Sequence, residues 1–339
     1  MTRELCGRFG GDPATLAFFG GGQDWSDGVL FMFAPEAKAA PRDMVLKILE
    51  FKKDDAQGLA IAEDRLRLVR GFGENGARIV LPEPSRGGAI FETVTEGGSL
   101  YMGYAYAKAR GRSVEKRDRI AHQGAFYRAM GDVIGRMHAV SEARAETLSP
   151  DGTSDAGGSI KGWRNEWEFF RAWCKDEEVG AAWERLRDAL AGLPVDKAGY
   201  GFVHNDAHVW NLIFDPDSQA VRSGGEPEFT VIDFDCANYQ WYMLDSAIAL
   251  HSTLVFSEGG FESESGPPVG FRDRVFAAFW EGYRRHREPG REWLDRLDLF
   301  IQYRRCLAFM PFQEETAKHP EWRSRWKRRI LEENARLLG

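Results

Sequence analysis

The chain has 339 residues, with 45 Lys and Arg against 52 Asp and Glu, so its formal net charge is −7. Hydrophobic residues make up 43% and charged residues 29%, fractions typical of a chain with a folded core, which excludes wholesale disorder. The acidic balance argues against a general nucleic-acid binder, because such proteins carry a basic footprint. The length favours two lobes over a single domain.

The cysteines and the N-terminal segment indicate a compartment. The four cysteines, Cys6, Cys174, Cys236 and Cys306, form no CxxC pair. They therefore favour neither a disulfide framework nor a zinc knuckle, and a reducing cytoplasm is the simplest interpretation. No apolar signal core opens the sequence and no long apolar run follows, so we expect a cytoplasmic protein without a membrane partner.

The first third of the sequence predicts a sheet. Five apolar runs have strand length, and an amphipathic stretch over 54–70 separates the third from the fourth and predicts a helix. The expected strands are 15–19, 29–33, 44–49, 88–94 and 99–106. We therefore expect a five-stranded, mostly antiparallel sheet with one inserted helix, forming an N-terminal lobe over 1–103.

The rest of the sequence, 104–339, predicts a larger and mainly helical lobe for catalysis and acceptor binding. Helical patterns cover 119–140, 163–190 and 271–339, and two short strands are expected near 211–215 and 229–233. The fold class is therefore α+β. Trp163 and Trp167 have helical spacing that favours core packing, with a place in an acceptor site as the alternative.

The strongest chemical signal is HNDAHVWN at 204–211, followed by IDFD at 232–235. Phosphoryl transfer needs a carboxylate that orients the attacking hydroxyl, and oxygen ligands for the Mg²⁺ that accompanies ATP. The pattern HxDxxxxN supplies Asp206 as the base and Asn211 as an amide ligand of the metal. Asp233, at the end of the next strand, supplies a carboxylate ligand. The segment predicts an ATP-dependent kinase that acts on a hydroxyl group.

The N-terminal lobe supplies the expected nucleotide contacts. Lys47, on the third strand, has the context of a lysine that grips the α- and β-phosphates, with Glu63 as its helix partner and Glu50 as the less favoured one. The glycine-rich stretch at 20–28 is expected to cover the phosphates through backbone N–H groups, and the lobe junction is expected to contact the adenine. The candidate residues there are Gly21, Gly22, Ser26 and Tyr106.

With these motifs the sequence resembles the aminoglycoside phosphotransferase and choline kinase superfamily over nearly its whole length. The matching segments are GGGQDWSDG, VLKIL, GRMHAV, HNDAHVWN and VIDFDCANYQWYMLDSAIAL. The resemblance implies a protein-kinase-like fold, ATP and Mg²⁺ as cofactors, and a small-molecule acceptor such as an aminoglycoside, a choline-like amine, an amino alcohol or a sugar. It leaves the individual acceptor and the oligomeric state open.

The resemblance also implies supporting roles for particular residues. His204 is expected to brace the catalytic loop, and Asp245 is expected to be structural. Asp235, where protein kinases have glycine, points to the small-molecule branch, and its own role stays open. One departure is Asn205, at a position where relatives usually have glycine.

Other functions compete with this hypothesis. The same fold could serve a protein Ser/Thr kinase of the bacterial stress-response type, or a nucleotide-binding module without turnover. Asp233 and Asp235 form a DxD pair of the kind that glycosyltransferases use, although the upstream lysine strand leaves this alternative little room. His204, Asp206 and His208 could also form a zinc cluster, but the short-ribbon context favours Mg²⁺ on oxygen ligands.

Overall fold

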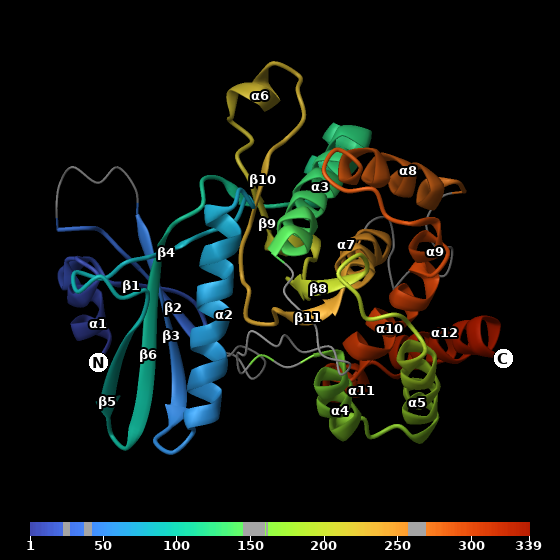
Figure 1. Ribbon diagram of the computed structural model, residues 1–339, viewed down its shortest axis with the longest axis horizontal. Coiled ribbons are helices and arrows are strands. Elements are labelled where there is room, and N and C mark those ends of the chain that lie inside the picture. Colours follow the sequence, from blue (N-terminus) through green and yellow to red (C-terminus); the bar gives the residue numbers. More distant parts are fainter. Residues whose placement is uncertain (23–27, 37–42, 145–159, 161, 257–268) are drawn as a thin grey trace. The chain divides into compact units, whose positions relative to one another are not determined.

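The computed structural model describes residues 1–22, 28–36, 43–144, 160, 162–256 and 269–339 (Figure 1). The chain divides into two compact units: Met1–Arg110 with Gly158–Ile160, and Gly111–Gly157 with Lys161–Gly339. The expected lobe boundary after residue 103 falls inside a strand that continues to Ala107, so the compact units divide further along the chain, after Arg110.

An antiparallel sheet forms the centre of the first unit. Its strand order is β1-β2-β3-β6-β4, and β5 pairs with β6. The strands are β1 Ala17–Gly21, β2 Gly28–Phe33, β3 Met44–Lys52, β4 Pro82–Glu83, β5 Glu92–Glu96 and β6 Ser99–Ala107. The sheet thus has six strands, and the prediction of five was wrong, because the two-residue β4 carries no alternating pattern. The expected strand 88–94 starts only at Glu92, because a turn with Gly88 at φ 84° precedes it.

Two helices cover the two faces of this sheet. Helix α1 (Thr2–Arg8), which the sequence analysis did not predict, packs Leu5 against Leu46 and Ile48 on one face. Helix α2 (Ala56–Glu74) packs Leu66 against Leu49 on the other. Helix α2 matches the predicted helix 54–70, and it starts where the Asp55 side chain accepts the Gly58 N–H at 2.8 Å.

The second unit is mainly helical. Helix α3 (Lys116–Arg144), which contains one non-helical residue at Gln123, packs closely on α8 (Phe271–Tyr283). Glycines permit this approach, because a Cβ atom added at Gly131 would lie 1.9 Å from the Phe279 carbonyl oxygen. The remaining helices are α4 Trp163–Trp173, α5 Glu177–Ala191, α6 Gln219–Arg222, α7 Tyr242–Phe256, α9 Arg291–Leu294, α10 Leu297–Phe309, α11 Gln313–Ala317 and α12 Pro320–Leu338.

The expected single helix 163–190 is two helices, α4 and α5. The break occurs where Cys174 adopts an extended conformation and Asp176 caps α5 by accepting the Val179 N–H at 3.2 Å. Trp167 and Trp183 pack across this break, and each indole N–H donates to the other residue's carbonyl, at 3.0 and 3.1 Å. These buried tryptophans, together with buried Trp163, support the core interpretation of the spacing.

Short strands carry the chemistry-bearing segments of the second unit. Strand β8 (Tyr200–Val203) pairs with β11 (Asn238–Trp241). The two predicted strands are present as β9 (Leu212–Phe214) and β10 (Phe229–Val231), and β7 (Arg112–Ser113) adds to β9. The predicted continuous helix after residue 271 is broken into α8 to α12.

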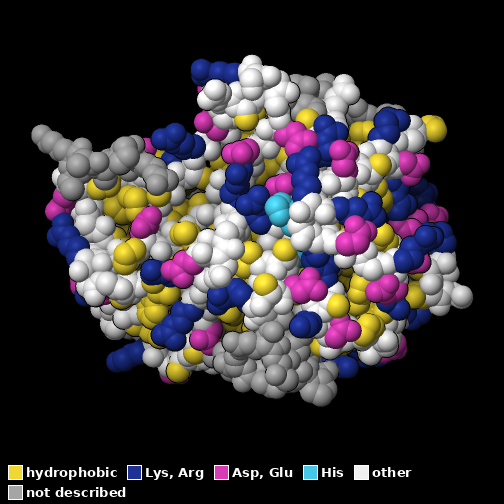
Figure 2. Space-filling model, turned by 45° about the horizontal axis from the view of Figure 1, so that its top comes forward, with side chains coloured by type: hydrophobic (Ala, Val, Ile, Leu, Met, Phe, Trp, Pro, Cys, Tyr) yellow, Lys and Arg dark blue, Asp and Glu magenta, His cyan; other side chains and the backbone are white. Residues whose placement is uncertain are grey.

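None of the helices in the described ranges is long and apolar enough to cross a membrane. Figure 2 shows acidic and basic side chains interspersed over the face drawn.

Candidate active site

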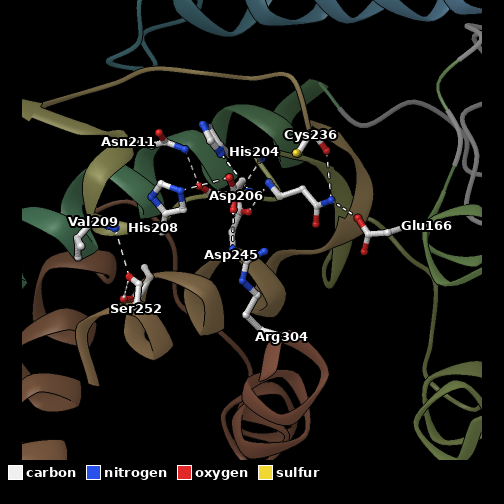
Figure 3. Close-up of polar contacts among 12 residues, drawn as sticks. Glu166, His204, Asp206, His208, Val209, Asn211, Cys236, Asp245, Ser252 and Arg304 are labelled. Atoms are coloured by element: carbon white, nitrogen blue, oxygen red, sulfur yellow. Dashed lines mark hydrogen bonds and ion pairs between the residues drawn. The ribbon is translucent and has the colours of Figure 1, made fainter. Parts of the chain in front are cut away.

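The segment HNDAHVWN connects β8 to β9, and its last three residues form the short 3₁₀ turn Val209–Asn211 (Figure 3). Asn205 has a φ of 64°, a left-handed conformation that L-residues seldom adopt. Asn is, after Gly, among the residues that tolerate it best. The loop therefore turns sharply immediately before Asp206.

Asp245, in the first turn of α7, fixes this loop. Its side chain is fully buried and accepts the backbone N–H groups of His204 at 2.9 Å and Asn205 at 2.6 Å. The Nε2 of His138, on α3, lies 3.2 Å from the same carboxylate. Burial lowers the pKa of His138 despite this hydrogen bond, so a neutral His138 donates from Nε2 while its Nδ1 lies 2.9 Å from the Tyr283 hydroxyl. This geometry supports the structural role expected for Asp245.

His204 joins the loop to the strand that carries Asp233. Its Nε2 lies 2.9 Å from the Ile232 carbonyl oxygen, and its Nδ1 accepts the Asp206 N–H at 3.2 Å. These contacts select the neutral tautomer with the proton on Nε2, and the Phe234 ring packs on the imidazole at 4.4 Å between centroids. Since both ring nitrogens bond to the backbone, His204 is unavailable as a zinc ligand. In the described part of the chain no cluster of three or more His, Cys, Asp or Glu residues suits a metal ion.

Asp206 is held through both of its carboxylate oxygens. Oδ1 accepts from Nη2 of Arg304 at 2.7 Å, and Oδ2 lies 3.3 Å from Nε2 of His208. Burial raises the pKa of this carboxyl, but the charges of Arg304 and His208 more than offset that effect and hold the pKa well below its usual range. Asp206 is therefore an ionised and oriented carboxylate at neutral pH.

The two predicted metal ligands come from the ends of one β-ribbon. The side-chain amide of Asn211 donates to the Asp206 carbonyl oxygen at 3.0 Å, and the Asn211 carbonyl accepts the Ile232 N–H at 3.0 Å. Asp233 follows Ile232, is exposed and has a φ of 66°. With the Asn211 amide nitrogen engaged, Oδ1 is the side-chain atom of Asn211 that could ligate a metal, and the Asp233 carboxylate is the second candidate ligand. Both are hard oxygen donors and suit Mg²⁺. Asp235 is half-buried, and its role is not defined by these contacts.

Glu166 on α4 is a further residue of this site, and the sequence analysis did not find it. Its carboxylate accepts the side-chain amides of Asn205, Asn238 and Gln240 and the Tyr303 hydroxyl, the last at 2.9 Å. Burial raises the pKa of Glu166 more than these hydrogen bonds lower it. Glu166 thus ties the catalytic loop to β11 and to α10. Arg304, also unforeseen, lies on α10 and reaches Asp206 from 98 positions further along the chain.

The predicted phosphate-binding residues lie in the first unit. Lys47 on β3 is only 5% exposed and pairs in register with Tyr104 of β6. Because alternate residues of a strand share a face, Lys47 lies on the face that Leu49 presents to α2. Glu63 on α2 forms its ion pair with Arg67, so a Lys47–Glu63 pair stays a prediction.

The glycine turn of this unit is shaped by close backbone approach. Gly21 has a φ of 84°, and a Cβ atom there would lie 2.2 Å from the Gly28 carbonyl oxygen, which also accepts the Gly22 N–H at 3.0 Å. Ser26 lies outside the described residues. Tyr106 lies inside β6, paired with Val45 of β3, so its expected contact with adenine also stays a prediction.

Known proteins resemble this chain in sequence and in fold. The model of the phosphotransferase enzyme family matches residues 36–294. The chain belongs to this family. The amicoumacin kinase of Bacillus subtilis (strain 168) is 24% identical over 245 residues, which cover 71% of this chain and 66% of that protein. The chain therefore matches just under two thirds of that relative's length.

Solved structures agree on the fold. An amicoumacin kinase in complex with AMP-PNP, Ca²⁺ and Ami superposes with a TM-score of 0.77 at 20% identity, over 98% of this chain and 92% of that one. A microcompartment-associated aminopropanol kinase superposes with a TM-score of 0.68 at 16% identity, over 100% and 99%. The predicted family and protein-kinase-like fold are therefore confirmed.

Proposed function

We propose that this protein transfers the γ-phosphoryl group of Mg-ATP to a hydroxyl group of a small molecule. Membership of the phosphotransferase enzyme family supports this, and so do relatives named as kinases of amicoumacin and aminopropanol. The observation that carries the proposal is the state of Asp206, which is ionised and fixed by Arg304 and His208 directly beside Asn211.

In this transfer, the residues of the second unit have different roles. Asp206 accepts a hydrogen bond from the acceptor's hydroxyl and aims that oxygen at the γ-phosphorus. As the new P–O bond forms, the bond from the γ-phosphorus to the bridging oxygen breaks, ADP departs with the electron pair, and the hydroxyl proton passes to Asp206. A carboxylate with a low pKa is a weak base, so its main contribution is orientation, as expected for a loose transition state.

Asn211 and Asp233 would hold Mg²⁺, which neutralises charge on the phosphate oxygens. Both residues contribute hard oxygen atoms, and the Asn211 amide is kept in position by its bond to the Asp206 carbonyl. The loop containing Asp206 and the ribbon end containing Asp233 are connected through His204, which bonds to the Ile232 carbonyl. Because Asp206 is assigned to the acceptor's hydroxyl and Asp233 to the metal, we nevertheless expect substitutions at the two aspartates to have separable effects.

The test compares wild type with Asp206→Asn and Asp233→Asn. Transfer of ³²P from Mg-ATP is measured against amines, aminoglycosides, amino alcohols, sugars and a lysate protein fraction, and Mg-ATP binding is measured separately. Asp206→Asn should keep nucleotide binding and lose about 10²–10⁴-fold in transfer, whereas Asp233→Asn should lose the Mg²⁺-dependent part of binding. Asp217→Asn, an aspartate whose side chain is 80% exposed, is the matched control.

Three results would overturn the proposal. Wild type might bind no Mg-ATP, Asp206→Asn might transfer phosphate as fast as wild type, or labelling might occur only on proteins. The last result would favour a protein Ser/Thr kinase on the same fold. Tight ATP binding without transfer to any acceptor would favour a binding module.

A further inference from the structure

Arg304 lies beside the base and spends little of its hydrogen-bonding capacity there. One N–H of its guanidinium donates to Asp206 Oδ1 at 2.7 Å, and the side chain is 17% exposed. A guanidinium carries several further N–H donors in a rigid plane. In the described ranges these donors have no other protein partner. They are therefore available immediately next to the Asp206 carboxylate.

Among the residues described, the two carboxylates that interact with Arg304, those of Asp206 and Glu166, are already engaged by other side chains. Asp206 itself is engaged through one oxygen by Arg304 and through the other by His208. Glu166, the next carboxylate, already accepts from three side-chain amides and a tyrosine hydroxyl. The buried His251 of α7 also interacts with Arg304, and because burial lowers its pKa this imidazole is neutral and does not attract a cation.

α10 fixes the position of Arg304 through its neighbour in the chain. Tyr303 is 1% exposed and donates its hydroxyl hydrogen to Glu166 at 2.9 Å, while its ring packs on Trp183 at 4.5 Å between centroids. The Arg304 side chain thus starts from an anchored backbone and points toward Asp206 (Figure 3). An arginine held in this way is a preorganised donor for an oxygen atom of a ligand.

We propose that Arg304 is an acceptor-binding residue whose remaining N–H groups bind an oxygen atom, as hydroxyl, carbonyl or carboxylate, close to the reacting hydroxyl, and so select acceptors that carry oxygen rather than ammonium there. This inference rests on the proposed kinase function and names the acceptor chemistry next to the phosphorylated group. An ammonium elsewhere on a larger acceptor is compatible with it.

The test uses glycerol and two probes that each differ from it in one group: D-glycerate, with a carboxylate, and serinol, with an ammonium group. Phosphorylation by wild type is compared with Arg304→Gln and Arg304→Lys, and probe binding to the complex with Mg²⁺ and AMP-PNP is measured by calorimetry, so that no turnover is needed. Wild type should favour glycerate over serinol. Arg304→Gln should reduce this preference by about 10–100-fold, mainly through KM, and Arg304→Lys should restore part of it.

His208→Gln is the matched control, because it alters the other oxygen of Asp206 and leaves Arg304 in place. It should lower kcat without changing the preference between probes. Nucleotide binding and thermal unfolding of each variant separate a folding defect from a binding defect.

The failures are distinguishable. If wild type binds no Mg-ATP, the kinase proposal fails. The acceptor inference alone fails if Mg-ATP binds but serinol is preferred, or if no oxygen-bearing probe binds. It also fails if Arg304→Gln lowers the phosphorylation of all probes equally, because Arg304 would then only position Asp206. Finally, faster transfer to every probe in Arg304→Gln would mean that Arg304 blocks Asp206.

Discussion

Replacement of Asp245 by Asn tests how the catalytic loop is held. The carboxylate is fully buried. Its Oδ1 accepts the backbone N–H of Asn205, and its Oδ2 accepts that of His204 and also lies 3.2 Å from His138 Nε2. An Asn side chain has the same shape but one acceptor oxygen, so its NH₂ group must face at least one of these donors. In the better orientation it faces the N–H of Asn205 and keeps the other two contacts.

The cost follows from these contacts. One buried N–H without a partner costs about 1–3 kcal/mol, and the two retained hydrogen bonds each lose the charge assistance of a carboxylate, about 1 kcal/mol apiece. We therefore expect Asp245→Asn to lower the free energy of unfolding by about 3–5 kcal/mol. Because native proteins are stable by only about 5–15 kcal/mol, this is a large fraction of the total.

Urea unfolding followed by fluorescence measures this change, since the chain has 11 tryptophans. Asp217→Asn serves as the control, because the Asp217 side chain is 80% exposed and lies 3.6 Å from that of Arg222, which is 69% exposed. The control should stay within about 0.5 kcal/mol of wild type. An Asp245→Asn protein that unfolds at the same urea concentration as its control, with the same slope, would refute the assignment of Asp245 as the anchor of the loop.

Three further predictions concern stability. Asn205→Ala should be less stable than Asn205→Gly by about 1 kcal/mol in urea unfolding, because both lose the same side-chain bonds and only Ala is strained at a φ of 64°; equal stabilities would contradict the left-handed geometry. Burial lowers the pKa of His138, so on acidification the unfolded chain binds a proton at this histidine at about pH 6.5, before the folded chain does. Below that pH the free energy of unfolding should fall by up to about 1.4 kcal/mol per pH unit. His138→Gln should flatten this slope between pH 7.5 and 5.5, and an unchanged slope would show that His138 is not the group responsible. Gly28→Ala should cost about 1–3 kcal/mol by thermal unfolding, because the new Cβ would lie 2.8 Å from Leu49 Cδ2 and 2.9 Å from the Ile48 carbonyl oxygen; an unshifted midpoint would show that β2 and β3 separate easily.

Local patterns predicted much of the architecture. Apolar runs of strand length located β2 and β3, and the 3.6-residue spacing located α2, because β3 is buried on both faces and α2 packs one face on the sheet. The misses have a local cause as well. Strand β4 has two residues and α1 has seven, too few for any periodicity. The break between α4 and α5 depends on the Asp176 cap, which resembles an ordinary acidic helix residue in the sequence.

The residues of the active site also divide into those that the sequence predicts and those that it does not. His204, Asp206 and Asn211 were found because one short loop carries them at fixed spacing, and the structure joins them through backbone hydrogen bonds. Arg304 and Glu166 could not be found, because they reach the loop from α10 and α4. No spacing in the sequence encodes such contacts, which exist only after the helices have packed.

Asn205 shows how the two kinds of information combine. The resemblance to the family implies glycine at this position, and the left-handed φ of 64° explains why glycine would suit it. The structure adds what a glycine could not supply: the Asn205 side-chain amide donates to Glu166, and also to the Cys236 carbonyl at 3.2 Å. Since Glu166 also accepts from Tyr303, the residue before Arg304, this substitution links the backbone turn at Asp206 to the helix that holds Arg304. Asn205 and Glu166 should therefore be coupled in a double-mutant cycle. Removal of Asn205 takes one donor from the Glu166 carboxylate, and removal of Glu166 takes one acceptor from the Asn205 side-chain amide.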